Sequence, residues 1–164
     1  MKKICLEPWI DNNPIILIVG TMPGEQSLQD QSYYANPRNK FWKYIEAILN
    51  NGIELKSKED KQKLLYSNGI GLWDTLSICD RKGSLDSHIK NYQPNDFSKF
   101  QSVKFILCNG KKAYQYFTRY NADYLQNREC IELPSTSPAN ASISDDVKFA
   151  KWKKALASAL NRAI

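Results

Sequence analysis

Four short apolar runs rich in β-branched residues alternate with amphipathic segments along the chain. The run from Pro14 to Gly20 is continuously apolar and ends in glycine, which is typical of a strand buried on both faces of a parallel sheet. We expect it to be the central strand. Further strands are predicted at 70–74, 103–108 and 131–133.

Apolar residues at helical spacing predict that the segments between these strands are helices. Asn36 and Pro37 have the residue types of an N-cap and a first helical position, and the apolar pattern then runs from Phe41 to about 51–52. This interpretation places Asn39 in the first turn of a helix.

Three more helices are predicted along the chain. A capping-box pattern at 57–60 begins one that ends at 68–69, and the other two span 111–120 and 148–163. The resulting order, β-α-α-β-β-α-β-α, predicts a three-layer α/β/α sandwich with a central, mostly parallel sheet of about four strands.

Composition agrees with one globular unit. The chain has 164 residues, of which 42% are hydrophobic and 24% charged, so we expect a single domain over 1–164. The net charge of +6 and the pI near 9.1 favour a polyanionic partner. Whether the lysines of the last two predicted helices face that partner or only solvent is left open.

Several classes of protein are disfavoured. The N-terminus lacks the apolar stretch of a signal peptide, and no apolar run approaches the ~20 residues of a membrane span, so we expect a cytoplasmic protein. The four cysteines form no C-x-x-C pair, which disfavours a zinc or iron–sulfur site. We expect reduced thiols and neither metal nor cofactor.

Two loops follow predicted strands and are expected to frame one cleft. They are Gly20-Thr21-Met22-Pro23-Gly24 and 133–141, the segment Leu-Pro-Ser-Thr-Ser-Pro-Ala-Asn-Ala. Ligands of open α/β sheets bind at the carboxyl ends of the strands. The segment 33–42 combines amide, cationic and aromatic side chains, a mixture suited to a nucleobase.

These two loops, the segment 34–42 ending in Asn-Lys-Phe-Trp, and the run 69–74 together resemble the uracil-DNA glycosylase superfamily. Within it they are most similar to the DNA-deoxyinosine, or hypoxanthine-DNA, glycosylase branch, a neighbour of the mismatch-specific uracil and thymine glycosylases. The resemblance implies an enzyme that flips a deaminated base out of DNA and hydrolyses its glycosidic bond. It implies a monomer that needs no metal.

The resemblance also assigns residues near the helix that begins after 36. Asn39 matches the asparagine on which the deoxyinosine branch is thought to rely, so it is the expected catalytic residue. An amide cannot act as a general base, so it would orient a water or hydrogen-bond the base. Phe41 matches the aromatic on which the flipped base stacks. Without the resemblance, periodicity favours Phe41 as a core residue, and Asn39 is equally well explained by local backbone contacts.

The first loop departs from the wider superfamily. Uracil-specific members carry Asp or Asn where this chain has Met22, and a thioether can neither activate nor position water. The deoxyinosine branch shares this substitution, which leaves the water-activating group unassigned. Thr21 and Met22 are expected to offer backbone N–H groups to the base or phosphate.

Asp74 stands where an asparagine reads the uracil edge in other members. Ionised, it would accept from N1–H of hypoxanthine, and protonated it could also donate to O6. Capping of the next turn is the alternative interpretation, with nearly equal weight.

The second loop has Ser135 near the position of a histidine in the uracil enzymes. The resemblance assigns Ser135, Thr136 and Ser137 to a DNA phosphate and Asn140 to a wedge that fills the vacated stack. An ordinary polar loop is the alternative.

The function predicted from the sequence is therefore release of hypoxanthine from DNA. Three alternatives remain: a mismatch-type uracil-DNA glycosylase, a catalytically silent nucleic-acid binding module, and an α/β enzyme acting on a free nucleotide or nucleoside.

Overall fold

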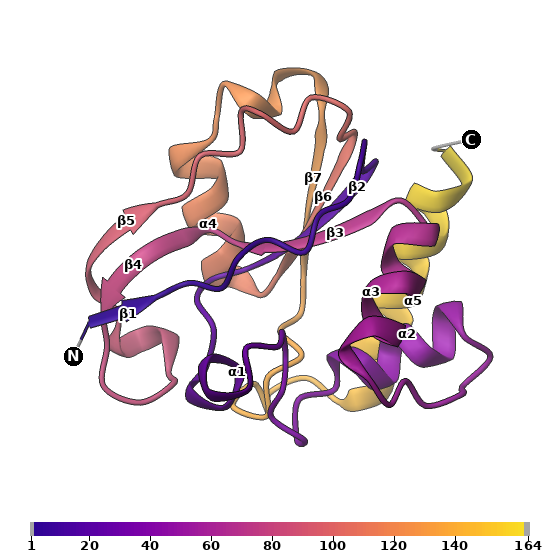
Figure 1. Cartoon of the computed structure of the whole chain (residues 1–164), viewed down its shortest axis with the longest axis horizontal. Coiled ribbons are helices and arrows are strands. Elements are labelled where there is room, and N and C mark those ends of the chain that lie inside the picture. Colours follow the sequence, from indigo (N-terminus) through magenta and orange to yellow (C-terminus); the bar gives the residue numbers. More distant parts are fainter. Residues whose placement is uncertain (1, 163–164) are drawn as a thin grey trace.

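The computed structural model describes residues 2–162 and is built around a four-stranded sheet. Its strands, in spatial order, are β3 (Ile70–Asp74), β2 (Ile16–Gly20), β6 (Phe105–Asn109) and β7 (Glu129–Leu133). All three neighbouring pairs are parallel. The prediction of a parallel sheet with 14–20 at its centre is confirmed, since β2 pairs with strands on both sides (Figure 1).

Alternate side chains of β2 face two different helical layers. Ile16 and Ile18 pack in one core, while Leu17 and Val19 pack in the other, and all four are fully buried. The first core lies against α2 (Phe41–Leu49), α3 (Lys58–Ser67) and α5 (Asp145–Arg162), and the second lies against α4 (Lys111–Tyr120). This arrangement is the predicted three-layer α/β/α sandwich.

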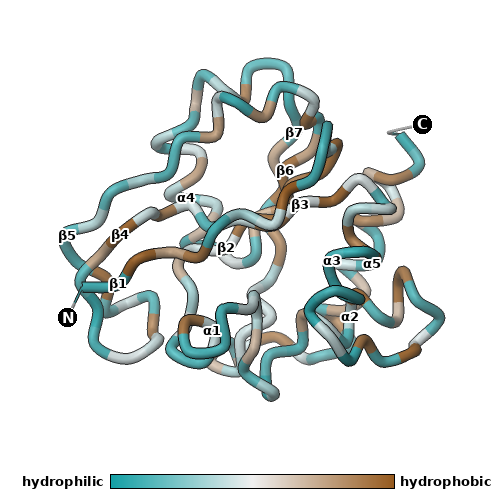
Figure 2. Tube along the Cα trace, in the orientation of Figure 1, coloured by the Kyte–Doolittle hydropathy of each residue, from teal (hydrophilic) through white to brown (hydrophobic). Residues whose placement is uncertain are grey.

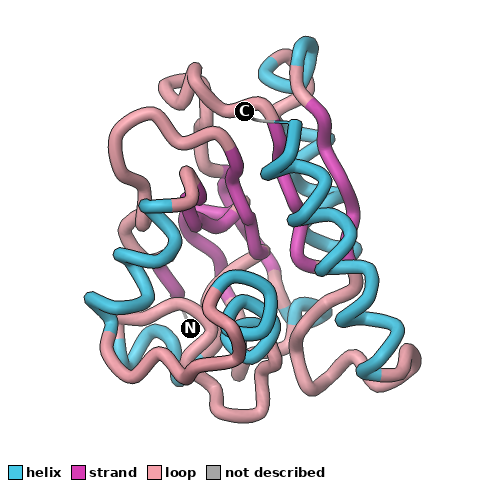
Figure 3. Tube along the Cα trace, turned by 90° about the vertical axis from the view of Figure 1, so that its right-hand side faces the viewer, coloured by secondary structure: helices cyan, strands magenta, loops and turns pink. Residues whose placement is uncertain are grey.

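The hydropathy of the chain follows these layers. The tube is brown along the middle of the sheet and mostly teal in the outer loops (Figure 2). Figure 3 turns the side bearing α2, α3 and α5 toward the viewer. No helix among residues 2–162 combines the length and apolar character needed to cross a membrane.

A second, smaller sheet was not predicted. It is antiparallel and consists of β1 (Lys2–Ile4), β4 (Leu76–Asp80) and β5 (Lys90–Pro94), with β4 in the middle. None of the strands predicted from the sequence falls between residues 75 and 102, where β4 and β5 lie. Most side chains of β5 are exposed, so this strand lacks the apolar alternation by which strands are recognised.

Three short helical elements were also missed: α1 (Glu25–Asp30), η1 (Asp86–His88) and η2 (Tyr124–Asn127). Each has six residues or fewer, too few for a helical period to be detected. The last helix, predicted from 148, begins at Asp145; the predicted end at Ala163 lies outside the described residues.

The predicted start of α2 is wrong. The helix begins at Phe41, and Asn36 is not its N-cap. Asn36 Oδ1 accepts a hydrogen bond from the Arg38 N–H at 2.9 Å, and Asn39 Oδ1 accepts one from the Phe41 N–H at 2.9 Å. Asn39 therefore lies in a turn before the helix and not in its first turn. The sequence does not separate these two positions, because an asparagine that closes such a turn makes the same kind of side-chain to backbone hydrogen bond as a helix cap.

Candidate active site

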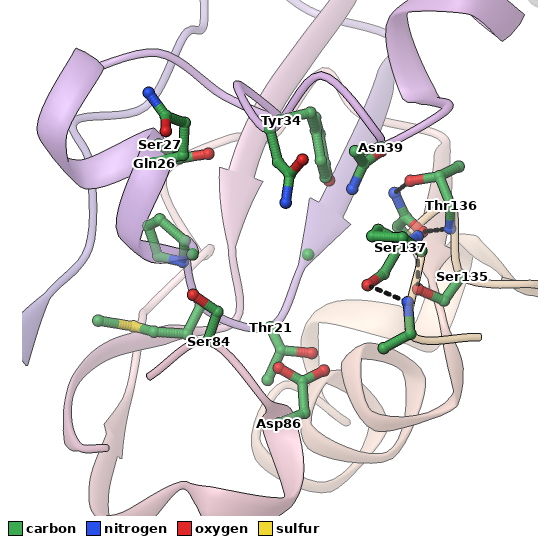
Figure 4. A pocket seen from close by; sticks show the side chains of 18 of the residues that line it. Thr21, Gln26, Ser27, Tyr34, Asn39, Ser84, Asp86, Ser135, Thr136 and Ser137 are labelled. Carbon is green, nitrogen blue, oxygen red and sulfur yellow. Dashed lines mark hydrogen bonds between the residues drawn. The ribbon is translucent and has the colours of Figure 1, made fainter. Parts of the chain in front are cut away.

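A pocket of about 480 Å³ opens at the carboxyl end of the parallel sheet. Both predicted loops line it, together with the segment around Tyr34 to Asn39, the end of β3 and residues 84–86. Figure 4 shows side chains from these separate segments converging on one space. The expectation that the two loops frame one cleft is confirmed, and the volume lies within the range of small-molecule sites.

The deep end of the pocket holds two polar groups without partners. The strand register pairs Gly20 with Asp74. Asp74 is only 3% exposed, and its Oδ2 and the hydroxyl of Tyr34 are buried without a hydrogen-bond partner among residues 2–162. An unpaired buried polar group costs about 1–3 kcal/mol. Because both residues line the pocket, a ligand can supply the missing partners.

Burial sets the protonation of both groups. Loss of hydration, reinforced by the charge of Asp86 and opposed by Arg81, raises the pKa of Asp74 to about 7. Near neutral pH this carboxyl therefore populates both its forms. Burial, followed by the charge of Asp74, raises the pKa of the Tyr34 phenol, so its hydroxyl stays protonated.

The amide of Asn39 has a defined orientation. Its Oδ1 accepts from the Phe41 backbone N–H, which can only donate, so the amide nitrogen is the end left free. Asn39 lines the pocket, and its nitrogen points into that space in Figure 4. The side chain thus presents a hydrogen-bond donor to a ligand. This geometry fits base recognition better than water activation.

The second loop is fastened to the sheet through Thr136, which is 1% exposed. The amide of Asn109, at the end of β6, donates to the Thr136 hydroxyl at 2.9 Å and accepts from its backbone N–H at 3.0 Å. The Thr136 carbonyl accepts from the Lys40 N–H at 3.1 Å. Thr136 therefore positions the loop, and that it also contacts a DNA phosphate stays a prediction.

The two serines beside it remain candidates for phosphate contact. Ser135 Oγ accepts from the Ser137 N–H at 3.1 Å, and Ser137 Oγ accepts from the Ala139 N–H at 3.2 Å. Each hydroxyl oxygen is held by a backbone donor, so its own proton is free to point outward (Figure 4). Asn140 is partly buried at the pocket, and the buried Lys148 ammonium donates to its carbonyl.

Comparison with known proteins agrees with this architecture. The family model described as the uracil DNA glycosylase superfamily matches residues 8–161. The chain belongs to the uracil DNA glycosylase superfamily.

Individual members of the superfamily are also similar over most of the chain. It is 34% identical to a hypoxanthine DNA glycosylase of Methanosarcina acetivorans, covering 88% of this chain and 91% of that protein. It is 36% identical to a protein of the same name from Methanosarcina barkeri, covering 71% and 76% respectively. A solution NMR structure of a candidate uracil DNA glycosylase from Methanosarcina acetivorans superimposes with a TM-score of 0.82, at 32% identity over 97% of this chain and 99% of that one.

One superfamily position does not lie as predicted. Phe41 is 0% exposed and does not line the pocket. The ring of Tyr34 stacks on it, with 4.1 Å between ring centroids, and Trp152 packs edge-on at 5.9 Å. Tyr34 therefore faces the pocket, and Phe41 supports this aromatic surface from behind. Both residues lie in the segment 34–42, but the sequence pattern does not show which of them is nearer the pocket.

Met22 lines the pocket, as expected, and that its backbone N–H contacts the base or phosphate stays a prediction. Its side chain is 7% exposed and belongs to a small apolar cluster with Leu76 and Cys79. The apolar cluster explains why methionine is suited to a position where other superfamily members carry Asp or Asn. Thr21 lines the pocket as well, with its carbonyl accepting from the Leu76 N–H at 3.1 Å.

Sequence reasoning missed three residues around the pocket. Tyr34 lies in the segment 34–42 that carries the resemblance, but the sequence assigned it no role. Its backbone is in the left-handed region, at φ 54°. Asp86 lies in a polar loop with no recognisable pattern, and Arg81 is buried with only 1% exposure. A charged residue immediately after β4 reads as a surface residue unless the strand itself is predicted.

Substituting Gly20 tests how closely the residues at the deep end of the pocket are packed. A Cβ at this position would lie 2.7 Å from Asp74 Oδ1 and 3.1 Å from the Tyr34 hydroxyl. We expect Gly20→Ala to destabilise the fold by about 1–3 kcal/mol through overpacking. Denaturant unfolding measures this, with Gly24→Ala as the comparison, since its Cβ would meet the Ser84 side chain, 3.3 Å from Oγ and 3.5 Å from Cβ. Equal stability of the two variants would contradict the described packing.

Asp74 should make stability depend on pH. Its pKa rises from 3.8 to about 7 on folding, so the folded state loses stability as pH increases from about 4 to about 7 and remains less stable above that. Asp74→Asn removes this loss, worth up to about 4 kcal/mol at 1.36 kcal/mol per pKa unit. We expect a higher Tm than wild type at pH 8 and little difference at pH 4, measured by circular dichroism. A Tm difference independent of pH would contradict the assignment.

Proposed function

We propose that this protein is a monofunctional DNA glycosylase that releases hypoxanthine from deoxyinosine in DNA. The observation that carries the proposal is the buried, unpaired carboxyl of Asp74 at the deep end of the pocket. The Watson–Crick edge of hypoxanthine presents an N1–H donor beside the O6 acceptor. An ionised carboxylate accepts from N1–H, and a protonated one also donates to O6. The two Methanosarcina relatives named hypoxanthine DNA glycosylase support the same substrate.

The pocket offers the other contacts that a flipped base needs. The Tyr34 ring, backed by Phe41, provides an aromatic surface, and base stacking on such a surface is worth about 1–3 kcal/mol. The Asn39 amide nitrogen donates to an acceptor on the base, where negative charge develops as the glycosidic bond breaks. These contacts offset the few kcal/mol needed to unstack the nucleotide.

The second loop contacts the strand that carries the flipped base. Free hydroxyl protons of Ser135 and Ser137 are suited to a phosphate oxygen. Asn140, partly buried, follows the exposed residues 138–139 of the loop and fills the vacated position in the stack. The net charge of +6 favours this encounter with DNA.

Uracil is a second candidate substrate because its edge also pairs an N–H donor with a carbonyl acceptor. A G/U mismatch-specific uracil DNA glycosylase of Schizosaccharomyces pombe is 28% identical over 58% of this chain, although the match covers only 29% of that protein. The apolar Met22, packed in the core, disfavours strong uracil activity because it cannot position water as Asp or Asn does.

Single-turnover incubation with duplexes containing one deoxyinosine, deoxyuridine or deoxyxanthosine tests the proposal. Alkaline cleavage of the abasic product should report rapid release at deoxyinosine and much slower release at deoxyuridine. The free nucleoside inosine should not be cleaved. Release chiefly at deoxyuridine would favour the uracil alternative, and no release from any duplex would favour a silent binding module.

Replacing Asn39 tests the donor role. Asn39→Asp keeps an oxygen for the Phe41 N–H but removes the donor that faces the pocket. We expect base release to slow by at least about 100-fold, the scale for loss of one donor to developing charge, with DNA binding nearly intact. Asn127→Ala, an exposed asparagine on η2, is the control and should behave as wild type. Full activity of Asn39→Asp would overturn the assignment.

A further inference from the structure

Two carboxylates besides Asp74 line the pocket, those of Glu25 and Asp86, and the proposed reaction has no role for either yet. Asp86 is the first residue of η1, and in Figure 4 it lies with Thr21 on one side of the pocket, away from Tyr34 and Asn39. Its side chain is 42% exposed, whereas Asp74 is almost fully buried. Asp86 is therefore at the solvent-facing mouth of the pocket, the side on which we place the sugar of a flipped nucleotide.

A buried arginine holds this carboxylate. The Arg81 side chain is 0% exposed; its Nη1 lies 4.0 Å from Asp86 Oδ1, and its Nη2 donates to the Pro23 carbonyl. Arg81 Nε and Nη1 have no hydrogen-bond partner among the described residues. A buried guanidinium without a counter-charge is costly, so its attraction to Asp86 fixes where that carboxylate stands. Arg81 thereby links the first loop to Asp86 and acts as a positioning residue.

Among the described residues, the other groups that line the pocket are less suited to take a proton from water. Glu25 lines it too, but its side chain is 60% exposed and its Oε1 lies 3.8 Å from the Lys3 ammonium. Met22 is apolar, and the Asn39 amide cannot act as a base. Asp74 lies deep in the pocket, where the base binds. The attacking water must approach C1′ from the face opposite the departing base, and Asp86 lies across the pocket from Asn39.

Building on the proposed function, we propose that Asp86 is the general base for the attacking water. A bond forms between the water oxygen and C1′ as the bond between C1′ and N9 breaks. The electron pair of the broken bond leaves with hypoxanthine, and the water proton passes to the Asp86 carboxylate. The departing base then takes up a proton from solvent. No oxidant, reductant or further reactant is needed.

The surroundings of Asp86 raise the basicity of its carboxylate. Partial burial raises its pKa, while the Thr21 hydroxyl and the Arg81 and Lys112 charges act in the opposite direction. Asp74, Tyr34 and Tyr116 also lie within electrostatic range, since the Asp86 charge raises the pKa of each. A carboxyl with a raised pKa is a stronger proton acceptor once ionised.

Asp86→Asn is the direct test, because it keeps the size of the side chain and removes its basicity. In single-turnover reactions on deoxyinosine duplex, with enzyme in saturating excess, we expect a rate about 10²–10⁴-fold below wild type. Binding to a duplex carrying a tetrahydrofuran abasic analogue should be unchanged or tighter. Asp80→Asn is the matched control; Asp80, on neighbouring β4, does not line the pocket and accepts only from Asn91 Nδ2 at 3.1 Å.

Two readouts separate a base from a structural partner of Arg81. The wild-type rate should fall on acidification as Asp86 is protonated, and this acidic limb should disappear in Asp86→Asn. Added formate should restore part of the rate of Asp86→Ala in proportion to its concentration. The proposal is overturned by an Asp86→Asn rate within about threefold of wild type, or by a slow variant that keeps the acidic limb and resists rescue. Wild type inactive on deoxyinosine would instead refute the proposed function.

Discussion

The pocket depends on the register between β2 and β3, which ends both strands at the same level. That register pairs Gly20 with Asp74 and brings the carboxyl close enough that any side chain at residue 20 would collide with it. Tyr34 closes the same space from a third segment. A parallel sheet with both faces covered excludes water from this edge, so the carboxyl is poorly hydrated and its pKa rises. The sheet thus creates the chemistry as well as the shape of the pocket.

Different depths of the pocket suit different tasks. The deep end is nearly dry and holds unpaired polar atoms, which favours recognition of a neutral base by hydrogen bonds. The mouth is wetter and is bordered by Asp86 and the serines of the second loop. Charged backbone, sugar and water all meet there. One small pocket can therefore exclude water from the base while admitting it to the sugar.

Much of this arrangement could be predicted from the sequence. Continuous apolar strands and capping signals have strong patterns, so the parallel sheet, its central strand and most helices were predicted. Strand ends also indicated that Thr21, Asp74 and the second loop would meet. The small sheet was missed because its outer strand is short, polar and exposed. The depth at which each side chain lies below the pocket could not be predicted from the sequence either. No sequence pattern indicates that Tyr34 covers Phe41, or that Arg81 is buried beneath Asp86.

The hydrogen bond from the Lys40 N–H to the Thr136 carbonyl joins the second loop to the residue that follows Asn39. The loop and the turn that aims Asn39 therefore form one mechanical unit, anchored to β6 through Asn109. In the proposed complex, tension that a DNA backbone exerts on this loop is transmitted along a short path to the amide that faces the base. In the proposed complex, binding of the DNA strand by the loop and alignment of the reacting base by Asn39 therefore depend on each other.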